Sequence, residues 1–570
     1  MNGLRRVGIS IFVVLGLVLA PTVSQAGAAS FSPTPGEYFV DTSTLQLTGP
    51  GGPIATGVDE GGIAVFAFDS INIPAGAEIF AEGSRPFELR SAGAFTLAGL
   101  IEASGFGAEV FTPGPNPGGP GGGAGSTSGF EAGAGPGGGG ATSDNSGGGG
   151  GGGFGGRGAA GGGPGPGASG PAYGDLNATF QGGSGGAGGT EVGGTDVGGG
   201  GGGGAVRLSA SSLTIPASGE VFADGGDGRT GGFGASGAGS GGAIVLRADT
   251  IAVEGLVSAE GGDGGGGGCC GDGGGGGGGR IAFQYRTSLA TAGTESVAGG
   301  ASGAGGTLGS GLASPDATGE EGVVTKLQVA TTATTSPASS ISTTGATLNG
   351  VVNPKGIATT YHFELGTTTA YGTTVPVPDG AVVSDSSDHA LSQAIAGLAP
   401  GTTYHYRIVA STLGFTTAGA DMTFATECSG VKITKGRAKV KNGKAQIKLS
   451  STGVCKGNLA LFMKAPPKGK AKGHGKGKGS ASKKGKGKGG KSIPIGSASF
   501  SFDAGQTKTV EVALSAAAIK RLKLGKALPA TAKATTTDSL GAKKTTQANV
   551  SLKLAKKGKG PKKGKGGKRP

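Results

Sequence analysis

The sequence contains no tryptophan, three methionines and four cysteines, and aromatic side chains make up 5% of its 570 residues. Length alone allows three or four domains. With 133 glycines and so few large side chains, the chain cannot fill all of them with an ordinary hydrophobic core. The cysteines also lack the Cys-x-x-Cys spacing of zinc and thioredoxin sites. Zinc binding and thiol redox chemistry therefore have no support.

A long hydrophobic run is missing beyond the N-terminus. Residues 1–28 have the parts of a signal peptide: a basic start at Arg5 and Arg6, an apolar run over 7–20, and small residues at 26–28. The run is too short to span a bilayer comfortably, and no cysteine follows it as a site for lipid attachment. We therefore expect an extracellular protein, secreted or associated with the cell wall, without a transmembrane segment.

Acidic residues are scarce in the C-terminal quarter. Residues 428–570 carry 36 Lys+Arg and 3 Asp+Glu, a net charge of +33, whereas residues 1–427 have a net charge of −20. The basic end uses lysine almost exclusively. Lysine is a hydrated point charge that suits diffuse attraction to a polyanion better than bidentate recognition.

Two Lys/Gly segments concentrate this charge: 466–491, expected as a disordered basic loop, and 556–570, expected as a disordered basic tail. The expected partner is an anionic cell-wall polymer, an acidic polysaccharide or extracellular DNA, bound non-specifically through counterion release. The segments lack aromatic residues for base stacking, which disfavours an intracellular nucleic-acid role. The residues expected to contact the polyanion are Lys483, Lys484, Lys486, Lys488, Lys491, Lys556, Lys557, Lys562, Lys563, Lys565, Lys568 and Arg569.

The segment GKGKGGKS, residues 485–492, fits the phosphate-binding pattern G-x-x-x-x-G-K-[ST]. A working phosphate loop follows a buried strand and opens a helix. Here a Lys/Gly tract comes before the motif, and Pro494 with β-branched residues after it favours a strand. We therefore expect no nucleotide binding and no cofactor.

A repeat is hidden among the glycines. INIPAGAEIFAEG (71–83) and LTIPASGEVFADG (213–225) share Ile-Pro-Ala, Phe-Ala and a final Gly. Each unit has three short runs of alternating aliphatic residues bounded by glycine, which indicates strands. Three strands per unit is what one coil of a parallel β-helix needs, and coils must stack to bury their apolar faces. The expected coils lie near 63–83, 87–105, 205–226, 243–262 and 280–298.

This organisation resembles the Gly-rich β-helical repeats of bacterial secreted and surface proteins. The expected order is a strand or linker region at 29–62, repeats over 63–300 and a linker at 301–324. Between the second and third coils, 106–204 consists almost wholly of small residues. Ordering it costs about 1–2 kcal/mol per residue, and its few large side chains recover about a fifth of that. We expect a disordered insertion unless the segment packs backbone to backbone.

Acidic residues recur at the coil turns, at Asp224, Asp227, Glu260 and Asp263. Parallel β-helices host polysaccharide lyases and hydrolases, so a secreted polysaccharide-active enzyme is the alternative function. That chemistry requires paired carboxylates. These acids recur because the repeat recurs, which favours solvated or weakly calcium-bridged turns. We therefore expect no catalytic residue.

Residues 325–426 are rich in Thr, Val and aromatics. GLAPGTTYHYRIVA (397–410) contains the pattern Leu-x-Pro-x-Thr-x-Tyr ending at Tyr404. The segment resembles the fibronectin type III domain, which implies that Tyr404 forms the tyrosine corner. The buried tryptophan of that fold has no counterpart, which implies a lighter core. His362 and His405 are expected to point outward on neighbouring strands, but no third ligand is in view, so no metal site is expected.

Residues 428–555 show strand-like alternation and one helix signal from Ser515 to Gly525. The segment resembles the small basic β-sandwich that ends many exported actinobacterial proteins, with six or seven strands and a spaced cysteine pair. We expect a disulfide between Cys428 and Cys455, since export permits it. Three alternatives stay open for Cys269 and Cys270: a strained vicinal disulfide, an intermolecular disulfide, or two reduced thiols.

The expected fold class is all-β: a Gly-rich parallel β-helix-like region followed by two β-sandwich domains, with long disordered Gly-rich and Lys/Gly-rich segments. The expected function is that of a non-catalytic secreted or cell-surface structural or adhesive protein. Its basic C-terminal region would bind anionic cell-wall or extracellular polymers.

Overall fold

The structure is a computed structural model that contains 35 strands and one helix among its described residues. Its nearly all-β content confirms the expected fold class. The chain divides into two units, Met1–Val329 and Ala330–Pro570, which are described separately. The expected signal peptide and both Lys/Gly segments lie outside the described residues. These are 29–108, 116–128, 130–143, 146–176, 179–190, 196–268, 270–304, 318–427, 430–451, 455–465, 492–503, 506–537 and 543–555.

Successive coils of the first unit build a sheet in the order β18-β16-β14-β10-β7-β1-β2-β3. Its pairings from β18 to β1 are parallel, and β1, β2 and β3 pair antiparallel at one edge. Its strands are β1 (Gly36–Asp41), β2 (Gln46–Gly49), β3 (Gly52–Thr56), β7 (Ala77–Glu82), β10 (Leu100–Glu102), β14 (Glu220–Phe222), β16 (Leu256–Ser258) and β18 (Thr294–Ser296).

A second sheet runs β19-β17-β15-β13-β8-β5-β4, with β9 pairing β13 and β6 pairing β9. All of these pairings are parallel except the one between β4 and β5. Its strands are β4 (Val58–Glu60), β5 (Ile63–Phe68), β6 (Ile71–Ile73), β8 (Phe87–Ser91), β9 (Ala94–Leu97), β13 (Ala205–Ile215), β15 (Ala243–Val253), β17 (Arg280–Thr291) and β19 (Val323–Gln328).

The core of this β-helix is a stack of equivalent aliphatic residues from successive coils. Ile79, Ile101, Val221 and Val257 occupy paired positions on β7, β10, β14 and β16. All four side chains are fully buried. Burial of each contributes about 1.5–3 kcal/mol, and no coil achieves it alone because the neighbouring coils supply the covering atoms.

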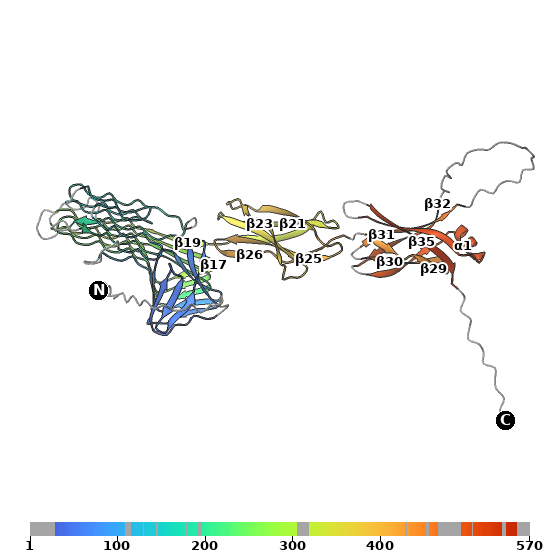
Figure 1. Cartoon of the computed structure of the whole chain (residues 1–570), viewed down its shortest axis with the longest axis horizontal. Helices are drawn as coiled ribbons and strands as arrows, with labels where there is room; N and C mark the ends of the chain where they lie inside the picture. The colour runs from blue at the N-terminus through green and yellow to red at the C-terminus, as the bar shows by residue number, and fades with distance from the viewer. Residues whose placement is uncertain are drawn as a thin grey trace, which may run out of the picture. The chain divides into compact units, whose positions relative to one another are not determined.

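Between strands of successive coils the chain runs out and back in long Gly-rich segments, which we call legs and which Figure 1 draws in teal and green above the blue strands. In the leg 237–242, N–H groups donate in rotation to three different segments. Every third N–H points the same way, so the leg has three residues per turn, as in a polyproline II helix. Such a helix has no internal hydrogen bonds, and here the carbonyl groups of neighbouring legs accept from its N–H groups instead. The donor–acceptor pairs are Gly237 to Ala187, Ala238 to Gly274, Gly239 to Gly226, Ser240 to Ser184, Gly241 to Gly277 and Gly242 to Ala223.

The described parts of 106–204 are ordered, and they follow the exception that the sequence left open, in which the segment packs backbone to backbone. Gly149 and Gly152 donate hydrogen bonds to Ala235 and Ala238, three residues apart on another leg. Phe154 is fully buried. The expectation of disorder weighed only the burial of side chains against the entropy of the chain, whereas each backbone–backbone hydrogen bond adds about 0.5–1.5 kcal/mol net. Two very short strands, β11 (Gly189–Thr190) and β12 (Asp196–Val197), also lie in this segment.

Glycine is required in these legs because neighbouring backbones approach too closely for a side chain. A Cβ atom on Gly239 would lie 2.0 Å from the carbonyl oxygen of Gly201, and one on Gly276 would lie 1.9 Å from that of Gly239. Real Cβ atoms essentially never approach other heavy atoms closer than 3.0 Å. We call this bundle of legs the glycine lattice.

Residues 330–427 form a sandwich of two antiparallel sheets, β20-β21-β24 and β23-β22-β25-β26, with β27 also pairing β25. The Tyr404 hydroxyl accepts a 3.0 Å hydrogen bond from the Ala399 N–H, which confirms the tyrosine corner. Tyr406, Phe363 and Leu348 are fully buried in the core. The strands are β20 (Thr332–Ser339), β21 (Gly345–Asn353), β22 (Thr359–Gly366), β23 (Thr373–Val382), β24 (His389–Ala396), β25 (Thr403–Thr412), β26 (Phe415–Ala418) and β27 (Met422–Ala425).

Residues 430–555 form one hydrogen-bonded sheet of eight described strands, where a sandwich of six or seven was expected; the order is β28-β30-β29-β35-β34-β31-β32 with β33 pairing β30. The sheet shares a single core, and we call this part of the chain the C-terminal sandwich. The helix α1 (Ala516–Lys523) follows Ser515 and ends before Gly525, which has a φ of +80°, as expected. The strands are β28 (Val431–Ile433), β29 (Gly436–Lys441), β30 (Lys444–Ser451), β31 (Cys455–Lys464), β32 (Ser492–Phe502), β33 (Thr507–Ala513), β34 (Leu528–Thr537) and β35 (Lys543–Leu554). Ser492, the last residue of GKGKGGKS, thus opens a strand and not a helix.

Both cysteines in the described part of the chain, Cys270 and Cys455, are disulfide-bonded. Cys269 and Cys428 lie outside the described residues. The Cys455 Sγ atom lies 3.8 Å from the Gly430 carbonyl oxygen, and Val431 pairs with Ser451. These contacts bring the chain next to Cys428 close to Cys455, and the Cys428–Cys455 bond stays a prediction.

Candidate functional site

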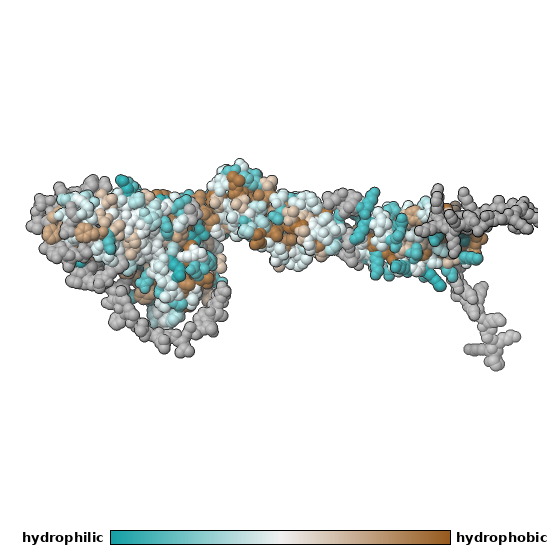
Figure 2. Space-filling view, turned by 45° about the horizontal axis from the view of Figure 1, so that its top comes forward, coloured by the Kyte–Doolittle hydropathy of each residue, from teal (hydrophilic) through white to brown (hydrophobic). Residues whose placement is uncertain are grey.

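The last sandwich carries a large positive charge that its own acids do not neutralise. Of the 36 Lys+Arg in 428–570, 18 lie on described residues. One ion pair forms among these described residues, between Lys444 Nζ and Glu511 Oε2 at 3.3 Å. Figure 2 shows hydrophilic side chains standing out from the C-terminal sandwich. Most of this charge is therefore not neutralised by an ion pair within the described residues.

Four lysines gather where β29, β30 and β35 meet, and we call Lys439, Lys441, Lys444 and Lys553 the lysine cluster. Lys439 pairs with Lys553 across the parallel strands β29 and β35, and Lys441 pairs with Lys444 across the β29–β30 turn. All four are exposed. Like charges directly opposite each other on neighbouring strands destabilise a sheet. An anion bound over the cluster would relieve this repulsion.

The lysine cluster lies next to the last described residue of the chain. The Ala555 N–H donates a 3.0 Å hydrogen bond to the Val440 carbonyl oxygen, which places Ala555 beside β29. The residues expected to bind a polyanion, from Lys483 to Lys491 and from Lys556 to Arg569, lie outside the described residues. The cluster itself was missed, although Lys-Val-Lys at 439–441 was a signal for two lysines on one face of a strand.

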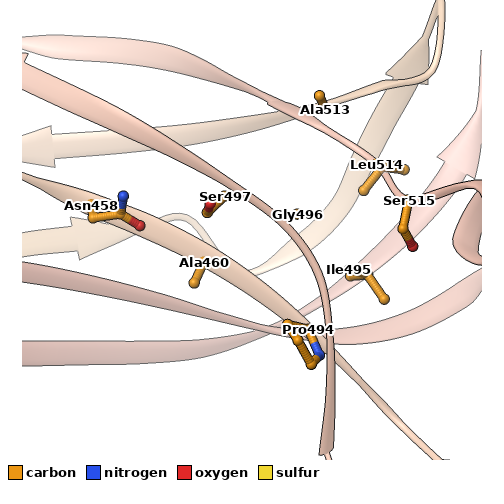
Figure 3. Close-up of a pocket in the computed structure, with 9 residues that line it drawn as sticks. All are labelled: Asn458, Ala460, Pro494, Ile495, Gly496, Ser497, Ala513, Leu514 and Ser515. Carbon is orange, nitrogen blue, oxygen red and sulfur yellow. The ribbon is translucent and has the colours of Figure 1, made fainter.

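A hollow of ≈ 580 Å³ lies on the same sandwich (Figure 3). It is lined by Asn458 and Ala460 of β31, by 494–497 of β32 and by 513–515. Its side chains are small or apolar, and its polar groups are neutral amide and hydroxyl groups. The hollow therefore contributes shape and hydrogen-bonding groups to this surface but no charge for an anion.

The acids at the coil turns connect successive coils. The Asp224 carboxylate is buried and accepts 2.7 Å hydrogen bonds from the Ser258 hydroxyl and the Glu260 N–H. Asp227 accepts one from the Asp263 N–H at 2.9 Å, and Asp263 accepts one from Ala301 at 2.8 Å. Each of these carboxylates thus holds the backbone of the next coil, which is a structural role.

The buried Asp224 makes the stability of the β-helix depend on pH. Burial raises the pKa of Asp224 to about 6, although the hydrogen bonds from Ser258 and Glu260 lower it. An unfolded Asp titrates near pH 4, so the folded state binds the proton more tightly between about pH 4 and about pH 6. Stability should therefore fall as the pH rises through this window.

Asp224→Asn should remove this pH dependence and raise the free energy of unfolding at about pH 7 by up to about 3 kcal/mol. Asn keeps the Oδ1 acceptor without the charge. Urea unfolding of the full chain at about pH 4 and about pH 7 measures the difference. Asp227→Asn, which keeps the oxygen that accepts from the Asp263 N–H, is the matched control for the substitution itself. A variant at Asp224 that is less stable than wild type at both pH values would contradict the expectation.

The histidines of the sandwich formed by 330–427 pair with separate aspartates. His362 Nδ1 lies 3.0 Å from Asp379, His405 Nδ1 lies 2.8 Å from Asp421, and a third, His389, contacts Asp385 at 2.7 Å. His362 faces Val409 across β22 and β25, whereas His405 faces Gly366 four residues further along. The two histidines therefore do not share one site. Within the described residues, no group of three or more His, Cys, Asp and Glu side chains is placed to hold a metal ion.

No protein-family model matches the chain, and no curated protein matches it. Among solved structures, the sensor domain of the anti-sigma factor RsgI4 from Pseudobacteroides cellulosolvens is similar at 20% identity, covering 17% of this chain and 89% of that one, with a TM-score of 0.14. The chicken CNTN1 FN1–FN3 domains match at 10% identity over 38% and 65% of the two chains, with a TM-score of 0.18.

A Ca²⁺-stabilised adhesin with which an Antarctic bacterium binds ice is similar at 15% identity. The match covers 42% of this chain and 52% of the adhesin, with a TM-score of 0.18. At these scores the likenesses carry no argument about function. In the described part of the chain, no helix is long and apolar enough to cross a membrane.

Proposed function

We propose that this chain is a non-catalytic structural or adhesive protein, secreted or held at the cell surface. Its C-terminal sandwich and Lys/Gly segments would bind an anionic polymer of the cell wall or the extracellular matrix. The observation that carries the proposal is the positive charge of 430–555. Within the described residues of this region, one lysine, Lys444, is neutralised by an ion pair, with Glu511. The N-terminal residues 1–28, with the features of a signal peptide, support export.

Binding would gain free energy chiefly from counterion release. A polyanion condenses small cations along its length, and lysines that replace them set those cations free. The lysine cluster provides fixed charges on strands, and residues 556–570 of the sequence carry more positive charge. Lysine forms no rigid fork of donors, so the expected selectivity is for charge density and not for a particular sugar or base.

The carboxylates at the coil turns support a non-catalytic role for the β-helix. General acid and base groups in glycoside hydrolysis flank the scissile bond as a pair. Asp224, Asp227 and Asp263 instead accept hydrogen bonds from the adjacent coil. We infer that the β-helix and the glycine lattice have a structural role.

The triple variant Lys439→Gln, Lys441→Gln and Lys553→Gln should bind heparin about tenfold more weakly than wild type at low salt. Three attractive charges near a polyanion, at a few tenths of a kcal/mol or more each, account for such a change. Titration of the full chain with heparin at about 50 mM NaCl measures it.

The matched control replaces the same three lysines with arginine, which keeps the charge and should keep the affinity. If the glutamine and arginine variants both bind as wild type does, the lysine cluster takes no part in binding. If neither wild type nor the arginine variant binds heparin, the polyanion proposal fails.

A further inference from the structure

Three arginines from separate coils surround one serine on the outer face of the second β-helix sheet. Arg90 on β8 pairs with Ser209 on β13, and Ser209 pairs with Arg247 on β15. Arg207 lies two residues before Ser209, on the same face of β13. Neighbouring strands are about 4.8 Å apart. The three arginines therefore lie on the strand of Ser209 or on one of its two neighbours.

The carboxylates near this group are fewer than the arginines. Glu88 is almost fully buried, with Arg90 Nε at 2.9 Å and Arg207 Nη1 at 3.4 Å from its carboxylate. Arg90 also contacts Glu60 at 2.9 Å. Arg247 instead donates a 2.8 Å hydrogen bond to the neutral Gln284 side chain. Among the described residues, this arrangement leaves one positive charge without a carboxylate contact.

Two buried polar atoms in the group make no hydrogen bond within 3.5 Å among the described residues. They are Arg207 Nε and the Ser209 hydroxyl, whose residue is 8% exposed. The Ser209 hydroxyl lies close enough to the Glu88 carboxylate to help lower the pKa of Glu88, and the Arg207 guanidinium carbon lies 4.2 Å from the centre of the Phe180 ring. Buried polar groups are normally satisfied, and a bound ion or ligand is one explanation of an exception.

Electrostatics favours an anion at this place. Burial, together with the nearby charge of Arg207, lowers the pKa of Arg247 to about 10. Burial also lowers the pKa of Arg207, against the charge of Glu88, which raises it. A negative group between these side chains would reverse the effect of the like charges.

We propose that Arg207, Ser209 and Arg247 form a binding site for a single oxyanion of an acidic polysaccharide. The oxyanion is either the carboxylate of a uronic acid or a sulfate ester. The Ser209 hydroxyl and the guanidinium N–H groups donate to its oxygens, and charge-assisted hydrogen bonds of this kind are short and strong. The ligand enters beside Arg90, whose side chain is 39% exposed.

This site lies in the first unit, and it recognises one group by directed hydrogen bonds. The lysine cluster instead attracts a charged polymer. The inference therefore goes beyond the proposed function, and either of the two stands if the other fails.

The experiment is calorimetric titration of the full chain with glucuronate and, separately, with inorganic sulfate, at about 150 mM NaCl. At this ionic strength, exposed charges are screened beyond about 8 Å, so weak attraction to surface lysines contributes little. We expect saturable binding of at least one anion to wild type. Stronger binding of glucuronate points to a uronic acid, and stronger binding of sulfate points to a sulfate ester.

Arg247→Gln should weaken this binding at least tenfold. Ser209→Ala should also weaken it several-fold, while the thermal midpoint of unfolding changes little because the Ser209 hydroxyl makes no hydrogen bond within 3.5 Å in the folded chain. This combination distinguishes a binding role from a structural one, in which the loss of Ser209 changes stability and leaves anion binding unchanged.

Two controls separate this site from other arginines and lysines. Arg286→Gln removes an arginine that pairs with Asp249 at 2.5 Å on the neighbouring coil, and it should bind as wild type does. The triple glutamine variant of the lysine cluster should also bind these small anions as wild type does. Wild type that binds neither anion, or Arg247→Gln that binds both as well as wild type, would overturn the inference.

Discussion

Raising the NaCl concentration from about 50 mM to about 200 mM should weaken the binding of the full chain to heparin about a thousandfold. A protein that neutralises six or more charges of a polyanion loses about this much, because salt opposes counterion release. Residues 428–570 together carry 36 Lys+Arg and 3 Asp+Glu. Dissociation constants measured over a series of NaCl concentrations should give a straight line in a log–log plot.

A chain that ends at residue 555 is the comparison for this prediction. It lacks the basic tail and should show a shallower salt dependence, since fewer cations are released from the polymer. The lysine cluster remains in this chain, so some salt dependence should persist. Affinity that is the same at both salt concentrations would show that binding does not arise from charge.

Gly239→Ala should lower the free energy of unfolding of the first unit by about 3 kcal/mol or more. The new methyl group would lie 2.0 Å from the Gly201 carbonyl oxygen, so the two legs must separate. Overpacking of this kind costs about 1–3 kcal/mol, and the loss of the hydrogen bond between Gly239 and Gly226 adds about 0.5–1.5 kcal/mol. Urea unfolding of the full chain measures the change.

Gly51→Ala is the matched control for this substitution. A Cβ atom at Gly51 meets nothing within 4 Å, so the change should alter stability by less than about 1 kcal/mol. If Gly239→Ala is as stable as Gly51→Ala, the close approach of the legs does not hold in solution.

The β-helix was predictable because its stability comes from side chains that leave a pattern. Ile215 and Val253 hold equivalent core positions on β13 and β15, and each is preceded by alternating aliphatic residues that mark a strand. The role of Tyr404 was also predictable. The sequence pattern before it determines the turn, and the turn places the Ala399 N–H beside the Tyr404 hydroxyl. In both places, short-range sequence determines the local structure.

The glycine lattice was not predictable from the same reasoning. Its stabilising contacts are backbone hydrogen bonds between segments such as 149–152 and 235–238, and a backbone contact leaves no trace in residue type beyond the lack of a side chain. The same lack of side chains is typical of a flexible linker. Composition therefore cannot tell the two apart without knowledge of what lies beside the segment.

The arginine site escaped the sequence analysis for a different reason. Arg90 and Arg207 are more than a hundred residues apart and become neighbours only because the insertion between them closes on itself. The repeat itself gave no hint, since Arg90 pairs with Ser209 and not with another arginine. The lysine cluster depends in the same way on the parallel pairing of β29 with β35.

The three-residue turn of the glycine lattice restricts how the length of its legs can vary. Adding three residues to a leg restores the direction of every later N–H group. Adding one or two rotates all of them by a third or two thirds of a turn. After such a rotation, the donors that meet Ala187, Gly274 and Gly226 would each face the wrong neighbour. Homologous proteins that share the lattice should therefore differ in leg length by multiples of three residues, so insertions and deletions in these tracts are constrained although their composition is nearly uniform.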